Sequence, residues 1–286
     1  MYASYWNIKD NPFLNVVDPR FLYAMDQYEE AIARFVFLAE SGRLGGVLTG
    51  PYGVGKSTVL KHVAAAIKSR HRLPIIQLDA IPGGQLPMAR HILADMKIGG
   101  PTTTLADTLM NFGHATQHGT EVLTRTLLCI DEAHYLTDGD GLYLVHYLSN
   151  LRITDRRTQS EVPLFTIILA GSPDLLSAIQ SHPSLSQRMQ IVFNLVPLSR
   201  EHTAAYIQHH MRAVGGDLWV FDQGALDALY RFSKGLPRKI NVLCDTALML
   251  GFAAKTHQIT AAIVNQAAQD TGLAATLAST SKKVPL

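Results

Sequence analysis

Residues 44–58 constrain the fold of this chain more than any other stretch. A short apolar run leads into the segment from Gly50 to Ser57, which matches the spacing G-x-x-x-x-G-K-[ST] at every fixed position. A helix-like stretch follows from Thr58. Because a phosphate-binding loop of this kind stands between a strand and a helix, the sequence predicts such a loop here.

The residue types in this loop have separate predicted roles. Three glycines allow the backbone to curl so that its N–H groups point at a phosphate, and the following helix adds its positive N-terminal end. Lys56 is expected to reach the β- and γ-phosphates of ATP, and the Ser57 hydroxyl to ligate Mg²⁺. The predicted nucleotide contacts are Gly50, Pro51, Tyr52, Gly53, Val54, Gly55, Lys56, Ser57 and Thr58.

A second informative stretch is the buried-strand pattern at residues 126–130, which ends in two acids. Asp131 is predicted to hold Mg²⁺ through water, and Glu132 to orient and deprotonate the attacking water. His134 completes the letters D-E-A-H, which also mark one helicase superfamily. We interpret that match as coincidence, because the chain carries none of the further motifs that such a helicase needs.

Three more side chains are candidates for roles in nucleotide hydrolysis. Ser172 follows an apolar strand at residues 165–170 and could sense the γ-phosphate, although a plain turn residue explains it equally well. Arg188 precedes the last strand, at residues 191–196, where an arginine can stabilise charge on the phosphoryl group of an adjacent subunit. Arg238 follows a helix-starting proline and can project back at the phosphates, the alternative being a surface salt bridge.

The alternation of strands and helices stops near residue 198, and only helical patterns follow. The pattern predicts an N-terminal arm and first helix over 1–43, an α/β nucleotide-binding core over 44–198, a helical lid over 199–270 and a flexible tail over 271–286. The aromatic-rich arm at 1–25 either covers an adenine ring or simply packs on the core.

Composition adds bounds on the partners and the compartment. The formal charge of +2 neither demands nor excludes a nucleic-acid partner, and two cysteines are too few for a disulfide framework. The N-terminus lacks a secretion signal, and eighteen apolar residues never occur without interruption. We therefore expect a cytoplasmic chain without a membrane span.

Taken together, these motifs resemble those of the AAA+ ATPases, and more narrowly the ExeA-type secretion ATPases. The narrower likeness depends on Asn11-Pro12-Phe13, Asp18-Pro19-Arg20-Phe21-Leu22-Tyr23, Asp131-Glu132-Ala133-His134, Leu169-Ala170-Gly171-Ser172-Pro173, Leu185-Ser186-Gln187-Arg188 and Gly235-Leu236-Pro237-Arg238. The resemblance implies a five-stranded parallel α/β core with a helical lid, ATP between them, and a homo-oligomer. It also implies that Arg188 acts as a finger across a subunit interface, and that Arg238 is the lid arginine.

Two departures from this family matter. Its members often carry glutamine where this chain has Ser172, and the secretion enzymes continue into a membrane span and a periplasmic part where this sequence stops. Family-level likeness favours an assembly factor for a secretion or pilus machine. The missing span favours the alternative, a transposition regulator that works with a transposase and forms a filament or ring on DNA. A nucleotide-gated scaffold with little turnover is a third possibility.

In the transposition alternative, a set of basic residues would contact DNA phosphates. It contains Lys61, Lys68, Arg70, Arg72, Arg152, Arg156 and Arg157. A helix predicted over 142–153 runs into the last three of them, and a solvated helix face is the simpler interpretation of these arginines.

Overall fold

The computed structural model describes residues 2–16, 18–70, 73–81, 84–118, 123–137, 140–155 and 158–275. Its internal contacts divide the chain into two compact units. Unit 1 contains Met1–Met25, Tyr52–Gly55 and Val196–Leu286, and unit 2 contains Asp26–Pro51 and Lys56–Leu195. The N-terminal arm therefore belongs with the C-terminal helices, whereas the predicted boundaries joined it to the first helix over 1–43.

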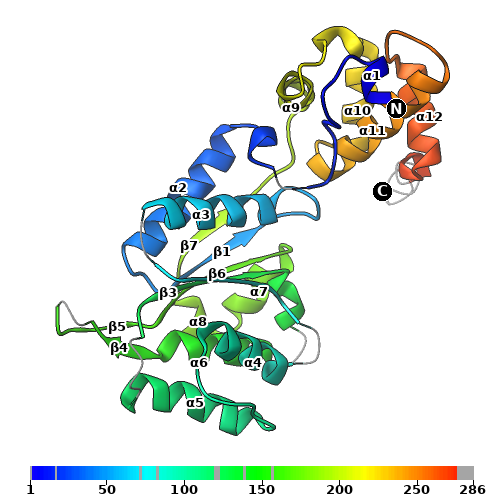
Figure 1. The fold of residues 1–286 in the computed structure, drawn as a ribbon. Helices are drawn as coiled ribbons and strands as arrows, with labels where there is room; N and C mark the ends of the chain where they lie inside the picture. Colours follow the sequence, from blue (N-terminus) through cyan, green and yellow to red (C-terminus); the bar gives the residue numbers. More distant parts are fainter. Residues whose placement is uncertain are drawn as a thin grey trace. The chain divides into compact units, whose positions relative to one another are not determined.

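Unit 2 is built on a five-stranded sheet of order β2-β3-β6-β1-β7, in which every neighbouring pair is parallel (Figure 1). Its strands are β1 (Gly45–Thr49), β2 (Ile75–Asp79), β3 (Thr126–Asp131), β6 (Phe165–Gly171) and β7 (Met189–Asn194). The three inner strands are buried at every position, as expected for a parallel sheet that is covered on both faces. This confirms the predicted five-stranded parallel α/β core.

Helices cover both faces of this sheet. Those of unit 2 are α2 (Asp26–Glu40), α3 (Lys56–Arg70), α4 (Gln85–Met96), α5 (Leu105–His118), η2 (Ala133–Leu136), α6 (Gly141–Asn150), α7 (Asp174–Gln180) and α8 (Pro183–Ser186). Figure 1 shows α2 and α3 on one face, and α4 to α8 on the other. Apolar residues at helical spacing, such as Ala31, Phe35 and Leu38 of α2, are fully buried against the sheet side.

The strand register brings the carboxyl ends of the inner strands together. Thr49 of β1 pairs with Gly171 of β6, and Ile130 of β3 pairs with Leu169 of β6. In open parallel sheets, ligands bind outside the carboxyl ends of the strands. The phosphate loop after β1 and the acids at the end of β3 therefore share one edge of the sheet.

A short antiparallel hairpin replaces the end of a predicted helix. The helix expected over 142–153 ends at Asn150, Leu151 is extended, and β4 (Arg152–Thr154) pairs with β5 (Glu161–Pro163). The prediction was wrong because the apolar spacing of the helix continues by chance into Ile153, while β-branched Ile153 and Thr154 favour a strand.

Unit 1 contains the C-terminal helices and the arm. Its elements are α1 (Tyr2–Tyr5), η1 (Pro19–Phe21), α9 (Arg200–Ala213), η3 (Leu218–Val220), α10 (Gln223–Ser233), α11 (Pro237–Ala253) and α12 (Ala261–Asp270). The side chains of Ser199 and Asp222 accept N–H bonds at the starts of α9 and α10. None of the helices in the described ranges combines the length and the apolar composition that crossing a membrane requires.

The arm is fastened to these helices by long-range contacts. The hydroxyl of Tyr2 and the amide of Asn11 both donate to Asp245 of α11, and the indole of Trp6 donates to the Leu248 carbonyl at 3.0 Å. The Trp6 and Phe13 side chains are buried within unit 1. Two roles were considered for the arm, covering an adenine ring and packing. These side chains take part in packing.

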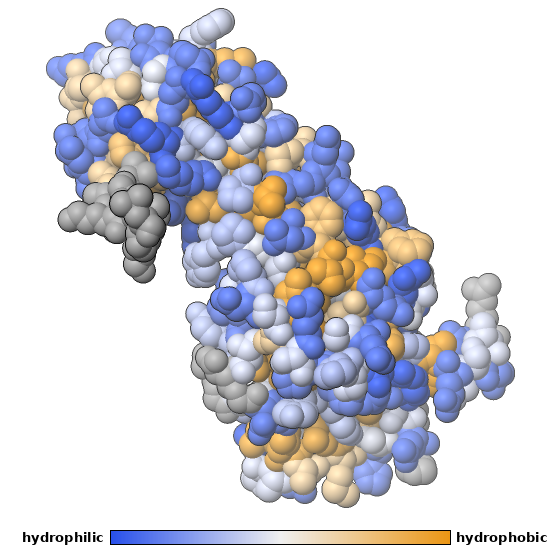
Figure 2. Space-filling model, turned by 180° about the vertical axis from the view of Figure 1, so that it is seen from behind, coloured by the Kyte–Doolittle hydropathy of each residue, from blue (hydrophilic) through white to orange (hydrophobic). Residues whose placement is uncertain are grey.

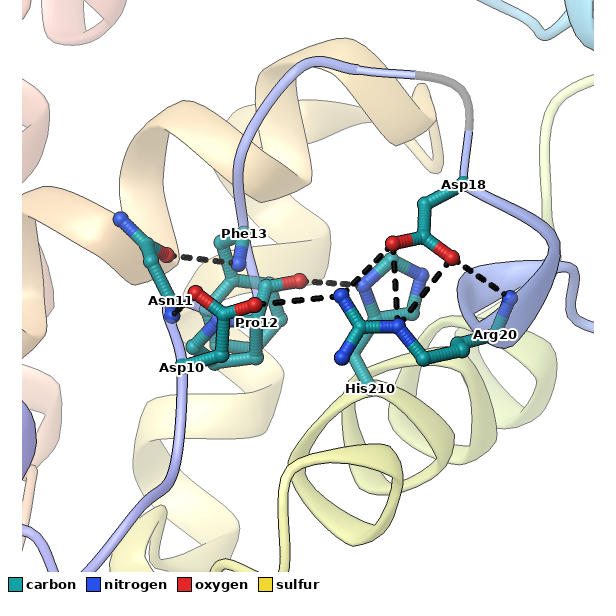
Figure 3. A network of polar contacts seen from close by, with 7 residues as sticks. All are labelled: Asp10, Asn11, Pro12, Phe13, Asp18, Arg20 and His210. Carbon is teal, nitrogen blue, oxygen red and sulfur yellow. Dashed lines mark hydrogen bonds and ion pairs between the residues drawn. The ribbon is translucent and has the colours of Figure 1, made fainter.

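His210 of α9 is the buried centre of the arm contact (Figure 3). Its ring stacks on Phe13 and on Phe21, with centroids 5.6 and 5.0 Å away. Its Nδ1 lies 2.6 Å from the Pro12 carbonyl, and because a carbonyl only accepts, Nδ1 carries the proton. Burial lowers the pKa of His210 to about 4, although the bond to Pro12 acts in the opposite direction.

This histidine predicts an acid-sensitive arm. The folded pKa lies below the ordinary value of about 6.5, so the unfolded chain binds more protons between these two values, and stability falls as the pH drops through this window. Between about pH 7.5 and about pH 4.5, wild type should lose about 2–3 kcal/mol more unfolding free energy than His210→Phe. Urea unfolding followed by Trp6 and Trp219, which both belong to unit 1, measures this difference. Parallel pH curves for the two proteins would contradict it.

Candidate functional site

The loop between β1 and α3 has the backbone that a phosphate cradle requires. Gly53 and Gly55 have φ angles of 79° and 109°, in a region that side-chain-bearing residues rarely adopt. α3 begins directly afterwards at Lys56, and its first turn contains no acidic side chain. The positive end of this helix is thus available to an anion.

Lys56 is held inside this loop. Its side chain is only 6% exposed, and its Nζ donates to the carbonyls of Gly50 and Pro51 at 3.0 and 3.3 Å. Burial lowers the pKa of Lys56, whereas the charges of Glu132 and Asp131 act to raise it. Since an ammonium has three donors, these two bonds leave one for a phosphate oxygen.

The two acids at the end of β3 have unusual local structure. Asp131 is buried, and its Oδ1 accepts the Glu132 N–H at 2.8 Å. Glu132 has φ 49° and ψ 31°, a left-handed backbone that costs a non-glycine residue about 1–3 kcal/mol. Strain of this kind is concentrated at functional sites. Here the left-handed backbone sets the direction in which the Glu132 side chain leaves the main chain.

His134 lies against this glutamate. Its Nδ1 is 3.3 Å from Oε2 of Glu132, close enough for an ion pair. The two atoms are not aligned as a hydrogen bond, and neither has another hydrogen-bond partner in the described part of the chain. The sequence analysis gave His134 no role. Its position two residues after Glu132 was the feature that could have indicated this contact.

The residues at this edge fit a magnesium nucleotide. The Ser57 hydroxyl and the Asp131 carboxylate are oxygen ligands, which Mg²⁺ prefers, and Lys56 supplies a partly desolvated cation for phosphate. Within the described ranges, groups of three or more His, Cys, Asp or Glu side chains that could hold a metal do not occur.

Ser172 lies at the same edge of the sheet. It directly follows β6, it is half-buried, and its carbonyl accepts the Leu175 N–H at 3.1 Å at the start of α7. This backbone bond is what a turn residue makes. A role for its hydroxyl in sensing phosphate stays a prediction.

Arg188 lies at the opposite edge of the sheet. It precedes β7, whose first residue Met189 pairs with Gly45 at the start of β1. Its Nε is buried without a hydrogen-bond partner among the described residues. The pKa of the nearby His146 is lowered, first by burial and then by the charge of Arg188. Arg188 is therefore not brought to the phosphate loop of its own chain.

Arg238 lies in unit 1 together with Tyr52–Gly55. Its backbone N–H donates to the Gly53 carbonyl at 3.2 Å, and its guanidinium stands 5.3 Å from the Tyr52 ring centroid. A Cβ at Gly53 would come within 2.8 Å of the Arg238 Cβ. The predicted lid arginine therefore contacts the tip of the loop, and this contact requires glycine at position 53.

The basic residues proposed for DNA are partly engaged within the chain. Arg152 donates to the carbonyls of Ser149 and Leu151, and Arg70 pairs with Glu40 at 3.9 Å. Lys61 and Lys68 are exposed on α3. Arg72, Arg156 and Arg157 lie outside the described residues.

Comparison with known proteins agrees with this geometry. A family model described as "AAA domain" matches residues 39–179. General secretion pathway protein A of Aeromonas hydrophila is 27% identical over 275 residues, which are 94% of this chain and 48% of that protein. The chain thus spans about half the length of this relative.

Solved structures share the fold at low identity. The Aeropyrum pernix ORC2 protein in its ADPNP–ADP complexes has a TM-score of 0.64 at 16% identity, over 92% of this chain and 72% of that one. The Aeropyrum pernix ORC1 protein in complex with DNA has a TM-score of 0.65 at 13% identity, over 88% and 68%. The AAA domain model therefore matches residues 39–179 of this chain, which is also similar over most of its length to General secretion pathway protein A and shares the fold of the ORC structures.

Proposed function

We propose that this chain is an ATP-binding and ATP-hydrolysing molecular switch. The observation that carries the proposal is the buried Lys56, whose ammonium is fastened to the carbonyls of a glycine loop at the sheet edge where Asp131 and Glu132 also lie. A desolvated cation beside two acids is an arrangement in which a phosphate can be bound and a water activated.

The proposal gives each residue of the site a role. The loop from Gly50 to Thr58 binds the phosphates, with Lys56 on the β- and γ-groups. Ser57 and Asp131 would hold Mg²⁺, which when bound neutralises phosphate charge. Glu132 orients the attacking water and accepts its proton. Arg238 contacts Gly53 at the tip of the loop, and we assign to it the sensing of the bound nucleotide.

We propose that the active form is a homo-oligomer with the nucleotide at a subunit interface. β1 has five residues, which span about 16 Å, so Arg188 at the amino edge is too far from its own phosphate loop to act there. It is free to act on the loop of a neighbour. Unit 2 also exposes large apolar side chains, including Phe37, Tyr143 and Val192, and Figure 2 shows hydrophobic residues gathered in patches on this unit.

The biological role that we propose is ATP-driven assembly of a secretion or pilus machine, from the cytoplasm and through a protein partner. The relation to General secretion pathway protein A supports this role. The alternative is an ATP-dependent regulator of transposition that binds DNA. Binding of duplex DNA with ATP at several salt concentrations separates the two, because phosphate contacts give a steep salt dependence. Salt-dependent binding would favour transposition, and its absence at low salt would remove that alternative.

Calorimetry of Mg-ATP binding tests the nucleotide site directly. Lys56→Ala should weaken binding at least about tenfold, because a charge-assisted hydrogen bond contributes about 1.5–3 kcal/mol. Lys61→Ala, an exposed lysine on the same helix, should bind like wild type. Absence of heat with folded wild-type protein, or equal affinities for Lys56→Ala and Lys61→Ala, would refute the site.

A further inference from the structure

The backbone of Glu132 is held by hydrogen bonds at both its N–H and its carbonyl. Its N–H is bonded to Asp131 Oδ1 at 2.8 Å, its carbonyl accepts the Tyr135 N–H at 3.0 Å, and its φ of 49° leaves the main chain little freedom. The Cα–Cβ direction is therefore set by the fold. What the backbone does not determine is the orientation of the carboxylate at the end of the side chain.

His134 is fixed equally well. Its carbonyl accepts the Thr137 N–H at 3.2 Å and the Thr137 hydroxyl at 2.6 Å, within the short helix η2. Its ring packs on Tyr135 with centroids 4.3 Å apart. Gly171 of β6 lies so close that a Cβ there would stand 3.0 Å from the His134 backbone nitrogen. The backbone that carries the imidazole is thus held in η2 and against the end of β6.

The contact between the two side chains selects one carboxylate oxygen. Oε2 of Glu132 is buried and faces Nδ1 of His134 at 3.3 Å. A carboxylate only accepts, so this contact needs a proton on Nδ1, which the neutral Nδ1–H tautomer and the imidazolium both carry. With Oε2 turned toward the imidazole, Oε1 is the oxygen left to accept a proton from water.

We propose that His134 is a positioning residue that holds the Glu132 carboxylate, by its Oε2, in the orientation from which Oε1 acts as the general base. This inference rests on the proposed ATPase function and adds a residue to it. A base must lie within about 0.5 Å of its productive position to act well, and a misplacement of about 1 Å can cost 100-fold. Without His134, the glutamate side chain rotates among several rotamers, and only part of the population is productive.

The test compares His134→Ala with His134→Asn. Asparagine carries an amide nitrogen close to the place of Nδ1, so it keeps a donor group beside Oε2, whereas alanine does not. The kcat of His134→Ala should be about 10- to 100-fold below that of wild type, with the Kd for Mg-ATP within about twofold. His134→Asn should regain most of the lost kcat. His91→Ala, which removes another histidine 3.8 Å from an acid on the exposed side of α4, should behave like wild type.

Three results would overturn the assignment. One is an unchanged or raised kcat in His134→Ala, and another is an equal loss in alanine and asparagine variants of equal thermal stability. The third is an additive loss in the double variant Glu132→Gln/His134→Ala, because a residue that acts only through Glu132 has nothing left to position. Failure of the proposed function looks different: folded wild type would then show no ATP turnover at all, which would end both ideas.

Discussion

Glu132→Gln is expected to lower the kcat of ATP hydrolysis by about two to four orders of magnitude while ATP still binds. Glutamine keeps the size of the side chain and its left-handed backbone, but its amide cannot take a proton from water. The loop contacts of Lys56 are untouched, so the Kd for Mg-ATP should stay near the wild-type value. Phosphate release gives the rate, and calorimetry gives the affinity.

Glu161→Gln provides the matched control. Glu161 is an exposed glutamate of β5 in the same unit, so its substitution makes the same chemical change away from the sheet edge. Its kcat should equal that of wild type. If Glu132→Gln turned over ATP as fast as this control, Glu132 would not be the base, and a nucleotide-gated scaffold would become the better description of the protein.

The phosphate loop and the acids could be predicted because their chemistry is contiguous in the sequence. The whole loop lies within one segment, Gly50 to Ser57. The apolar run before Asp131 predicts a strand, and thereby places Asp131 and Glu132 at its carboxyl end. Parallel strands that are buried on both faces are runs of apolar residues, so the strands of the sheet could also be predicted from the sequence. The local sequence sufficed for these features because each is formed by neighbours in the chain.

Features that depend on distant or exact pairing could not be predicted. The arm belongs to unit 1 through contacts such as that of Tyr2 with Asp245, which are 243 residues apart. The contact of His134 with Glu132 depends on a residue with a left-handed backbone, followed by a tight helical turn. A left-handed backbone at a glutamate cannot be predicted from residue type alone. The position of Arg188 relative to the loop follows from strand order and register, which periodicity does not specify.

Arg188→Ala is expected to remove about three to five orders of magnitude from kcat, the usual contribution of an arginine finger. Assembly and ATP affinity should persist, because Arg188 lies at the amino edge of the sheet, away from the loop of its own chain. Phosphate release, calorimetry and size-exclusion chromatography measure the three quantities. Arg34→Ala, which removes an exposed arginine of the same unit that pairs with Glu30, should match wild type in all of them.

Mixing Arg188→Ala with Lys56→Ala tests whether the finger acts between subunits. Arg188→Ala keeps an intact phosphate loop, and Lys56→Ala keeps an intact finger, so an interface that takes the loop from the first and the finger from the second is complete. With equal amounts and random assembly through a head-to-tail interface, about a quarter of the interfaces are complete, and activity should recover to a comparable fraction. A mixture that stays inactive, although each variant assembles and exchanges subunits, would place the finger elsewhere. Recovery of activity would mean that Arg188 and Lys56 serve one reaction from two chains, as we propose from their positions at opposite ends of the sheet strands.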